Sequence, residues 1–520
     1  MEQQNNVLPV KQEDKCQSAL TSEHKPVAPL LDKVRQKFGF YGGISLLFGG
    51  LFASLFFRAW IGLNALLFTA IMIAMLYLIM KKLVIKIKTG TWFLYFGALL
   101  LGFASFLTAS TILQFLNSIG ILLLLDLSLL HQLNEDRQWD FTKYIGRMFS
   151  LIGYSLITIG MPFTDSVRYM KTTKYLKNER LRNILIGVIV SIPVLLITTT
   201  LLSGADQLFG ELTGRIFRHV FSSDIFAFFC LLILGFLACY CILCGALMKA
   251  DTDISKPFVK ADASIAITFI SIVSLMYLVF CGIQILYLFA NGLFTLPAEF
   301  TFAEYARKGY FELLAVTMIN ISIILLCRSI FDENKWLRFL VIIMTSCTYV
   351  MIASAAYRMY LYITAYHFTF LRLFVVLTLF IDAFVLAGII ISEYNKKFPF
   401  FPYCVVVTMA CYLVFSFVKP DAFIAASLYK EKEKLNLEDL NYLTQKLSLD
   451  AAPYVIAILE DTSRLDLKTQ EEPVYGYNEP QTYEDCKTYY FDRITYAEEK
   501  SGLRDFNLSL YYAVRCAKNT

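Results

Sequence analysis

Eleven long apolar runs, separated by short polar connections, dominate the pattern along this chain. A helix needs ~20 largely apolar residues to cross the hydrocarbon core of a bilayer. The runs that meet this requirement are 38–57, 60–80, 91–109, 110–130, 183–202, 225–248, 263–290, 310–330, 336–357, 369–391 and 399–418. The pattern therefore predicts an all-α fold, a polytopic transmembrane helical bundle of about eleven spans over residues 38–418.

The two ends of the chain differ from this apolar middle part. Residues 1–37 are polar and contain neither an apolar stretch nor a small-residue cleavage site. We therefore expect a disordered cytoplasmic tail and no removable signal peptide. After residue 418 the hydropathy falls, and leucines recur at helical spacing over 437–447. Residues 419–520 are predicted to form a small helical C-terminal extracytoplasmic domain with a thin core.

The positions of Lys and Arg predict how the bundle is oriented. With the N-terminus in the cytoplasm, the loops on the cytoplasmic side contain 27 Lys and Arg, and those on the other side contain six. Cytoplasmic loops of membrane proteins carry such an excess. An odd number of spans then places the C-terminus outside the cytoplasm. Residues 1–418 carry 34 basic and 24 acidic residues, and we interpret this excess as an orientation signal rather than as a site for an anionic ligand.

One further apolar segment, residues 141–163, complicates the count of spans. Its first half is amphipathic, with apolar side chains on one face and Lys143 and Arg147 off that face. Its uninterrupted apolar part, 148–163, is short for a crossing. A crossing here would also move the basic loop 168–182 to the outside. We therefore predict a cytoplasmic interfacial or re-entrant helix with its basic residues near anionic headgroups.

Composition and motifs exclude several classes of function. The chain is 57% hydrophobic and 17% charged, too little charge to cover a soluble protein of this length. No phosphate-binding loop, metalloprotease motif or nucleophile elbow occurs. The four histidines, His24, His131, His219 and His367, lie in different segments, which argues against a multi-histidine metal site. We expect no metal, cofactor or nucleic-acid partner, and no set of catalytic residues is recognisable; the lipid bilayer is the expected partner.

Two carboxyl groups fall within predicted spans. Asp382 lies near the middle of the tenth run, in LFIDAFVL, and Asp126 lies toward the inner end of the fourth, in LLLDLSLL. Ionisable groups at membrane depth are costly and usually face the protein interior. Each is a candidate proton or cation site. The alternative is a carboxyl that is protonated or hydrogen-bonded to a neighbouring helix for structural reasons alone.

A second set of charged residues gathers at the predicted outer side. Glu304 and Arg307 precede the eighth run, Glu312 lies in its first turns, Arg358 ends the ninth and Arg372 begins the tenth. Arginine side chains bind carboxylate and phosphate groups with two hydrogen bonds, so this set can clamp an anionic headgroup or substrate.

A structural interpretation of the same region is also open. Tyrosines crowd the connection 357–366, as expected of an aromatic belt at headgroup level. Glu304 and Lys308 have the i,i+4 spacing of a local ion pair on a helix. The charged residues can therefore form structural ion pairs within such a belt.

The cysteines fall into two groups. Cys239, Cys241 and Cys244 lie in an apolar run without a histidine or carboxylate, which favours packing over metal binding. Cys486 and Cys516 fall outside the cytoplasm in the predicted orientation, where a disulfide between them can persist.

Five segments carry a resemblance to a known family. They read AEYARKGYFELL at 303–314, ASAAYRMYLYITAYHFTFLRLFV at 353–375 and KPDAFIA at 419–425, followed by LNLEDLNYLTQKLSLDAAPYV and LRDFNLSLYYA in the tail. In this order they resemble a bacterial, Firmicutes-type family of multi-pass membrane proteins known only as a domain of unknown function. The resemblance covers the chain from about residue 38 and implies bacterial origin and a plasma-membrane location. It implies no reaction, ligand or catalytic residue. Arg504, Asp505 and Phe506 stand where family members usually have Trp-Arg before Asn-Leu-Ser.

Three classes of function follow from these features. The leading hypothesis is a membrane protein that binds or transports a small or lipid-like ligand, because Asp382 lies at mid-membrane and the charged set lies at the outer side. The second is an envelope sensor or scaffold whose acidic external domain binds an envelope protein. The third is a membrane enzyme acting on a lipid-linked substrate, with Glu304 or Glu312 as base. No internal repeat of the kind common in transporters is clear.

Overall fold

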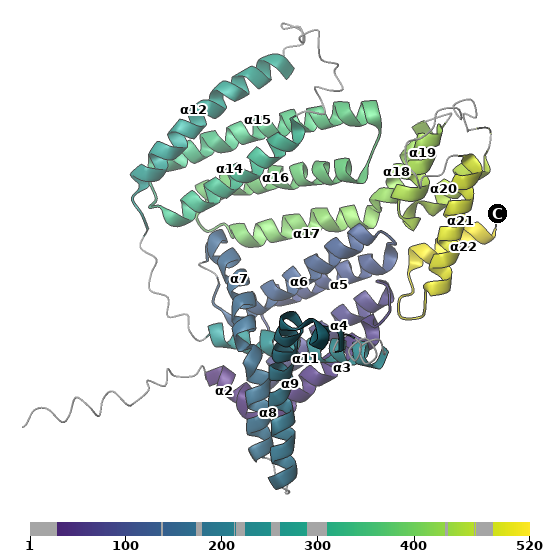
Figure 1. Ribbon diagram of the computed structural model, residues 1–520. Helices are drawn as coiled ribbons and strands as arrows, with labels where there is room; N and C mark the ends of the chain where they lie inside the picture. Colours follow the sequence, from purple (N-terminus) through teal and green to yellow (C-terminus); the bar gives the residue numbers. More distant parts are fainter. Residues whose placement is uncertain are drawn as a thin grey trace, which may run out of the picture.

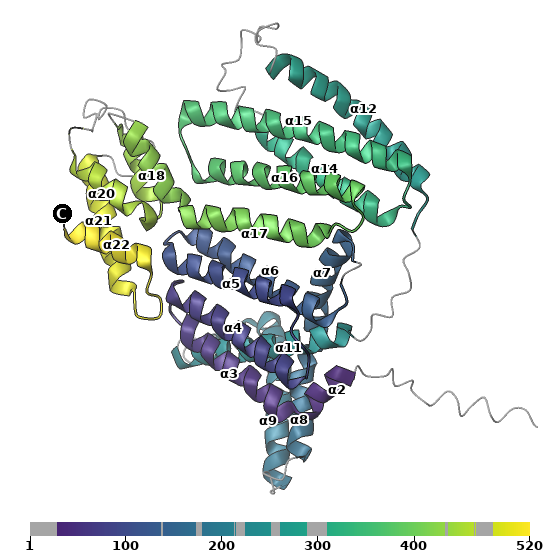
Figure 2. The ribbon, with the colours of Figure 1, turned by 180° about the vertical axis from the view of Figure 1, so that it is seen from behind.

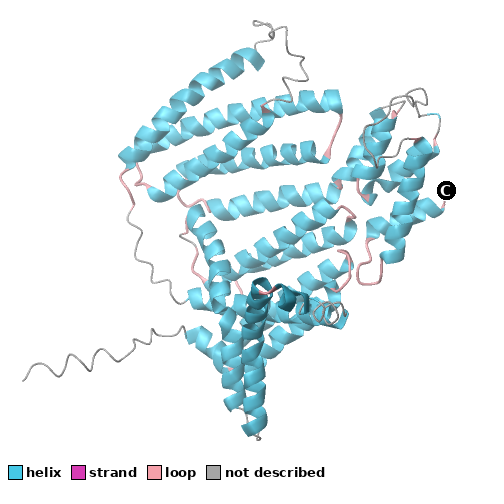
Figure 3. Cartoon of the chain, in the orientation of Figure 1, coloured by secondary structure: helices cyan, strands magenta, loops and turns pink. Residues whose placement is uncertain are grey.

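The computed structural model describes residues 29–136, 139–172, 179–212, 214, 224–250, 260–288, 309–431, 435–461, 463 and 482–519. Helices account for nearly all regular structure in these ranges (Figures 1 and 3), and an isolated β-bridge joins Ala261 to Phe331. The predicted all-α fold is therefore confirmed.

Five of the described helices form a first bundle around the N-terminal half of the chain. They are α3 (Phe38–Phe56), α4 (Leu63–Lys82), α5 (Thr89–Leu107), α6 (Thr111–Leu133) and α11 (Asp224–Ala250). Helix α11 packs along α3, as Figures 1 and 2 show. The two backbones meet at Gly49, where a Cβ atom would lie 2.3 Å from the carbonyl oxygen of Leu232. Glycine is therefore required at this crossing.

Five further described helices form a second bundle. They are α12 (Ala263–Leu288), α14 (Tyr310–Ile330), α15 (Lys335–Tyr366), α16 (Phe370–Tyr394) and α17 (Phe400–Val418). Their buried faces share one hydrophobic cluster that includes Ile270, Ile324, Met344 and Leu386. Helix α17 lies between α16 and α5 and so joins the two bundles (Figure 1).

Eleven of the described helical segments are long and apolar enough to span a membrane. Ten match predicted runs, and the eleventh is the continuous stretch Phe141–Lys171. That stretch contains α7 (Phe141–Ile157) and α8 (Met161–Thr172), which run crosswise to the bundle helices in both ribbon views. The predicted run 183–202 falls within α9 (Glu179–Ala205), which lies beside α8. The interfacial placement of 141–163 stays a prediction.

The bundle helices share two ends, which we name for the chain segments found there. The basic end carries the connections α4–α5, α6–α7, α14–α15 and α16–α17. Lys86, Lys88, Lys396 and Lys397 lie in these connections, and Arg328, Lys335 and Arg338 lie in the helix ends beside them. The tail end carries the connections α3–α4, α5–α6 and α15–α16 and the C-terminal helices (Figures 1 and 2). Helix α6 reaches the basic end, and α11 begins near the tail end, where Asp224 forms an ion pair with Arg58 at 2.6 Å. The chain between these two helices therefore passes from one end to the other.

The N-terminal tail is shorter than the predicted 1–37. Pro29–Gln36 forms helix α2, in which Leu31 and Val34 are buried against α3, α4 and α11. Arg35 binds Asp165 of α8, with Nε 2.9 Å from Oδ1, and the hydroxyl of Tyr240 donates to the same carboxylate. These contacts order a segment that composition alone predicts to be disordered. Residues 1–28 lie outside the described residues.

The C-terminal helices pack onto the tail end. They are α18 (Pro420–Glu431), α19 (Leu437–Asn441), α20 (Ala452–Glu460), α21 (Tyr483–Lys500) and α22 (Leu508–Lys518). We call them the tail helices. The predicted leucine seam is buried among them, and Ala109, Phe368, Phe370 and Leu373 of the bundles join the same cluster. The tail helices therefore contact both bundles.

Candidate functional site

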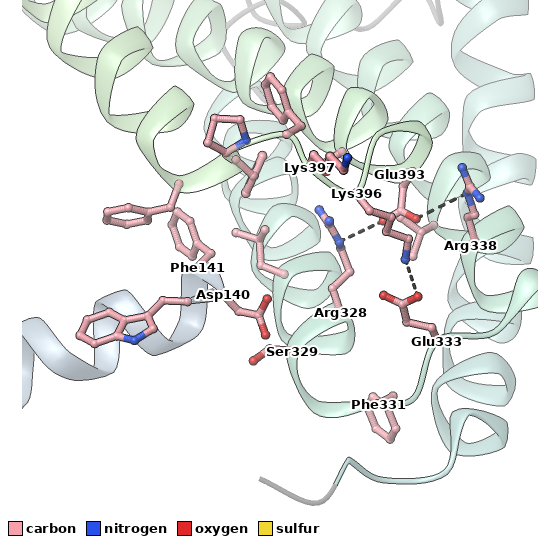
Figure 4. A pocket seen from close by; sticks show the side chains of 18 of the residues that line it. Asp140, Phe141, Arg328, Ser329, Phe331, Glu333, Arg338, Glu393, Lys396 and Lys397 are labelled. Carbon is pink, nitrogen blue, oxygen red and sulfur yellow. Dashed lines mark ion pairs between the residues drawn. The ribbon is translucent and has the colours of Figure 1, made fainter. Parts of the chain in front are cut away.

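A cavity of about 740 Å³ lies at the basic end, where the first bundle meets the second. One wall comes from the α6–α7 connection and the start of α7, and the other from the ends of α14, α15, α16 and α17 (Figure 4). Its volume is in the range of small-molecule sites. Among the described residues six Lys and Arg and five Asp and Glu line it.

A buried charged group of the cavity is Glu393 near the end of α16. Its side chain is about one tenth exposed and is held between two arginines. The Nε atom of Arg328 lies 3.0 Å from Oε1, and that of Arg338 lies 3.8 Å from Oε2. Figure 4 shows the two guanidinium groups approaching this carboxylate from opposite sides. A carboxylate of the chain itself thus occupies a site built for an anion.

Lysines surround this centre closer to the mouth of the cavity. Lys396 pairs with Glu333 at 2.5 Å, and both side chains are more than half exposed. The proximity of Lys396 lowers the pKa of Glu333. Lys335 and Lys397 also line the cavity and form no ion pair with a described residue. An exposed pair such as Lys396–Glu333 contributes little stability, so it can open at low cost.

Aromatic rings form the opposite, partly apolar wall. Tyr144 of α7 stacks on Phe401 of α17, with ring centroids 3.8 Å apart and planes at 5°. Phe141 packs edge-on against Phe401, and Arg328 lies over the ring of Phe400 at 5.5 Å. Trp139 lines the same wall. The cavity thus offers cations on one side and apolar ring faces on the other.

The loop after α6 is fixed by a hydrogen-bonded carboxylate, Asp136. Its Oδ2 atom lies 2.6 Å from Nδ1 of His131 and accepts a hydrogen bond of 2.9 Å from the hydroxyl of Tyr144. Burial alone would raise the pKa of Asp136, but hydrogen bonds from His131 and Tyr144 outweigh burial and lower it. Asp136 therefore stays ionised and ties the α6 end to α7 at the rim of the cavity.

The basic residues of this site are visible in the sequence, but their pattern there indicates orientation in the membrane rather than a binding site. Arg328, Arg338, Lys396 and Lys397 counted as orientation signals. Glu393 is the penultimate residue of α16, and a lone glutamate at a span end is unremarkable. Only the fold brings α14, α15 and α16 together and places these groups around one volume.

The charged set predicted at the outer side lies at the tail end. Glu304 and Arg307 lie outside the described residues. Glu312 is exposed on α14. Arg358 is 8% exposed, and its Nη2 donates to Oε1 of Gln284 at 3.3 Å.

Arg372 contacts the residues that end α15 at the same end of the bundle. It donates from Nη1 to the carbonyl oxygens of Tyr366 and His367, which end α15. Its guanidinium group also stacks on Tyr362 at 4.1 Å. A shared anion clamp of Arg358 and Arg372 with Glu312 stays a prediction.

The two intramembrane carboxyl groups lie in different bundles. Asp382 is 4% exposed and faces the interior of the second bundle, where its Oδ2 atom is 3.3 Å from Oγ1 of Thr317. Asp126 lies in the first bundle and is half-buried on α6. The structure does not bring them together.

The eleven cysteines among the described residues are free thiols. The disulfide predicted between Cys486 and Cys516 is not formed: Cys486 is fully buried in α21, and its sulfur lies 3.2 Å from Oδ1 of Asn441. The thiol has a hydrogen-bond partner inside the tail helices and is directed to it. Cys239, Cys241 and Cys244 lie in α11, where Cys241 and Cys244 are buried.

Comparison with known proteins gives one match. A family model described as "Domain of unknown function (DUF4153)" matches residues 95–458, most of the chain. Nothing among curated proteins matches, and no solved structure matches. The match spans the cavity, both intramembrane carboxyl groups and the start of the tail helices.

Proposed function

This chain belongs to the DUF4153 family, and we propose that it is a membrane carrier for an anionic amphiphile, bound in the cavity at the basic end. The observation that carries the proposal is Glu393, held between Arg328 and Arg338 inside that cavity. A ligand with a phosphate or carboxylate group can take the place of Glu393. Its apolar part then lies against Phe400, Phe401 and Trp139.

The chemistry of the cavity favours an anion over a cation or a neutral ligand. Two arginines share one carboxylate, and Lys335 and Lys397 line the cavity near them. Guanidinium groups form the strongest hydrogen bonds with carboxylate and phosphate oxygens. The aromatic wall adds apolar contact, which free inorganic phosphate cannot use.

The contact between the two bundles supports movement of such a ligand. The bundles meet along α5, α6 and α17, and at the basic end this contact widens into the cavity. The Lys and Arg of the loops and helix ends there support a cytoplasmic position for the basic end. We infer that the carrier is open to the cytoplasm in this conformation, with the tail helices outside the bacterial plasma membrane.

Trp139 provides a built-in reporter for binding. It lines the cavity and is one of four tryptophans in the chain. We expect dihexanoylphosphatidic acid to change the fluorescence of the purified protein in a neutral detergent. Dihexanoylphosphatidylcholine carries a compensating positive charge and should have no such effect. Inorganic phosphate should compete only at much higher concentration, and Trp139→Phe should abolish the signal.

Matched charge variants separate a binding site from a structural ion pair. Arg338→Gln removes a charge-assisted contact worth about 1.5–3 kcal/mol, so the affinity should fall about tenfold or more. Glu393→Gln removes the internal competitor and should tighten binding of the phosphatidic acid. Lys518→Gln and Glu498→Gln make the same charge changes at an exposed pair on the tail helices and should leave the affinity unchanged.

Two results would overturn the proposal. One is equal binding of the phosphatidic acid and the phosphatidylcholine. The other is weaker binding to Glu393→Gln than to the unmodified chain in a sample that unfolds at the same temperature.

A further inference from the structure

The second bundle contains a buried carboxyl group whose hydrogen bonding favours a bound proton. Thr317 of α14 is fully buried, and its Oγ1 atom has two polar neighbours: the carbonyl oxygen of Leu314 at 2.8 Å and Oδ2 of Asp382 at 3.3 Å. A hydroxyl has one hydrogen to donate. An ionised Asp382 and the carbonyl of Leu314 would both be acceptors for that one hydrogen. A protonated Asp382 can instead donate to Oγ1, so that the hydroxyl donates to the closer carbonyl and both contacts are hydrogen bonds.

Among the described residues, no cation lies at the level of Asp382. Helices α14, α15 and α17 pack against α16, and α18, which carries Asp421 and Lys430, packs against it at the tail end, where Phe370 and Leu373 join the cluster of Ile424. Tyr349 of α15 and Tyr403 of α17 reach this turn of α16, but their hydroxyls donate to the carbonyl oxygens of Ala383 and Phe384. No charged residue occurs within α17.

The charged residues of the other packed helices lie farther along their axes. Arg338 and Arg358 of α15 are ~16 and ~13 Å from the level of Tyr349 at 1.5 Å per residue. Arg328 of α14 is ~16 Å from the level of Thr317, and on α16 itself Arg372 and Glu393 are ~15 Å or more from Asp382. Glu312 of α14 is nearer but exposed. An ionised Asp382 would thus be a buried charge without a counterion, which is far more costly than a neutral carboxylic acid.

A bound metal cation does not fit this place. A hard cation requires several oxygen ligands. Besides the hydroxyl of Thr317, the same face of α14 offers the side-chain amide of Asn320. Its Oδ1 accepts from the hydroxyl of Tyr277 at 2.7 Å. The amide nitrogen of Asn320 donates to Thr348 at 3.1 Å. The oxygen and the nitrogen of this amide are therefore already hydrogen-bonded to α12 and α15.

Buried polar side chains continue from Asp382 toward both ends of the bundle. Asn320 and Thr348 are fully buried on the side of the basic end. Ser354 and Gln284 are buried on the side of the tail end, and the hydroxyl of Ser354 donates to the amide oxygen of Gln284 at 2.7 Å. Such a row inside a membrane bundle is costly and marks pathways of protons, ions or substrates.

From this geometry we propose that Asp382 is a proton-binding site within the second bundle. The carboxyl holds a proton on Oδ2, donates it to Oγ1 of Thr317, and exchanges it with water through the row of buried polar side chains. The site stands independently of the cavity at the basic end, because no residue of the cavity takes part in it.

Infrared spectroscopy of the purified full chain in lipid nanodiscs tests the proposal. We expect a protonated-carboxyl C=O band at neutral pH that Asp382→Asn removes and Asp126→Asn leaves in place. We expect the band to shift on transfer to D₂O, because the proton exchanges. Thr317→Val removes the acceptor and should move the band to higher frequency, whereas Thr317→Ser keeps the hydroxyl and should leave it in place.

Three outcomes would overturn the proposal. If Asp382→Asn removes no carboxylic-acid band, Asp382 is ionised. If the band is present but does not respond to D₂O in the folded protein, the proton is sealed in and the group is only structural. If Thr317→Val leaves the band unmoved, Thr317 is not the acceptor. Asparagine and valine keep the shape of the replaced side chains, and a melting curve of each variant verifies its fold.

Discussion

The two ends of the bundle differ in the kind of contact found there. At the tail end, the tail helices bind the first bundle through buried polar groups. The carboxylate of Asp450 accepts hydrogen bonds from the amide of Ala109 at 2.6 Å and from the hydroxyl of Thr108. At the basic end, the bundles face each other across a cavity, and the ion pairs that line it, such as Lys396–Glu333, lie within the second bundle.

The segment 502–507 shows how closely the tail end is fitted. The carbonyls of Arg504 and Phe506 accept from the first amides of α4, those of Asn64 and Leu63, at 2.8 and 2.9 Å. These amides have no partner within the helix, so the tail supplies the missing cap. A Cβ atom on Gly62 would lie 2.5 Å from the carbonyl oxygen of Asp505, so the tail can approach only because residue 62 is glycine.

The difference between the ends has a physical consequence. A buried amide or hydroxyl that loses its partner costs free energy, because no water replaces that partner. An exposed ion pair loses little when it opens, because water and other ions replace the partner. The tail end is therefore built to stay closed, and the basic end is built to exchange partners. The predictions below test this contrast.

The largest effect is expected from Asp450→Ala at the tail end. Asp450 is 4% exposed, and its loss leaves the amide of Ala109 and the hydroxyl of Thr108 without an acceptor. With about 1.5–3 kcal/mol for each hydrogen bond to a charged group, we expect a loss of about 3 kcal/mol or more. Denaturant unfolding of the purified protein measures it. Glu498→Gln, at an exposed pair with Lys518, should cost about 1 kcal/mol or less. Equal losses in both variants would remove the contrast between buried and exposed contacts.

A smaller effect is expected where the two bundles touch between their ends. A Cβ atom on Gly97 of α5 would overlap the sulfur of Met409 of α17. Gly97→Ala should destabilise the protein by about 1 kcal/mol, the low end for overpacking, because the flexible side chain of Met409 must move aside. Gly43→Ala in α3 is the matched control, since nothing lies within 4 Å of its added Cβ atom, and it should stabilise by about 0.5–1 kcal/mol. A stabilising Gly97→Ala would show that the bundles are not in close contact at α5 and α17.

The smallest effect concerns pH at the rim of the cavity. The pKa of Asp136 is lowered in the folded protein, so its stabilising contribution is present above its unfolded pKa of about 4 and is lost as the pH falls below that value. Acidification from pH 6 to pH 3 should therefore loosen the α6–α7 connection and change the emission of Trp139. Asp136→Asn should weaken this pH dependence, and Asp140→Asn, also at the cavity, should retain it. An unchanged pH profile in Asp136→Asn would exclude Asp136 as the titrating group.

The sequence predicted the fold class because each span is a local pattern. A run such as 369–391 contains its own evidence for a helix, and α16 occupies Phe370–Tyr394. The prediction that Asp382 faces the bundle interior also agrees with the structure, because a charge at that depth has few alternatives.

Contacts between distant segments were beyond the same reasoning. Helix α2 is held by Asp165, which is 130 residues away from Arg35. The cavity forms where the ends of α14, α15 and α16 come together. Nothing near Glu393 in the sequence indicates that Arg328 and Arg338 lie beside it. The outer charged set was inferred from nearness in sequence; of its described arginines, Arg358 donates to Gln284 and Arg372 donates to backbone carbonyls.

Thiol accessibility tests the contrast between the two ends most directly. In a chain with its twelve native cysteines replaced, Ser329→Cys places a thiol on the cavity wall, and Ser416→Cys places one where Ser416 binds Asn117 at 3.2 Å near the tail end. A membrane-impermeant maleimide, applied to membranes open on both sides, should label the first variant readily and the second only after unfolding. Equal labelling of both variants, or no labelling at Ser329→Cys, would contradict an interface that is open at the basic end and closed at the tail end.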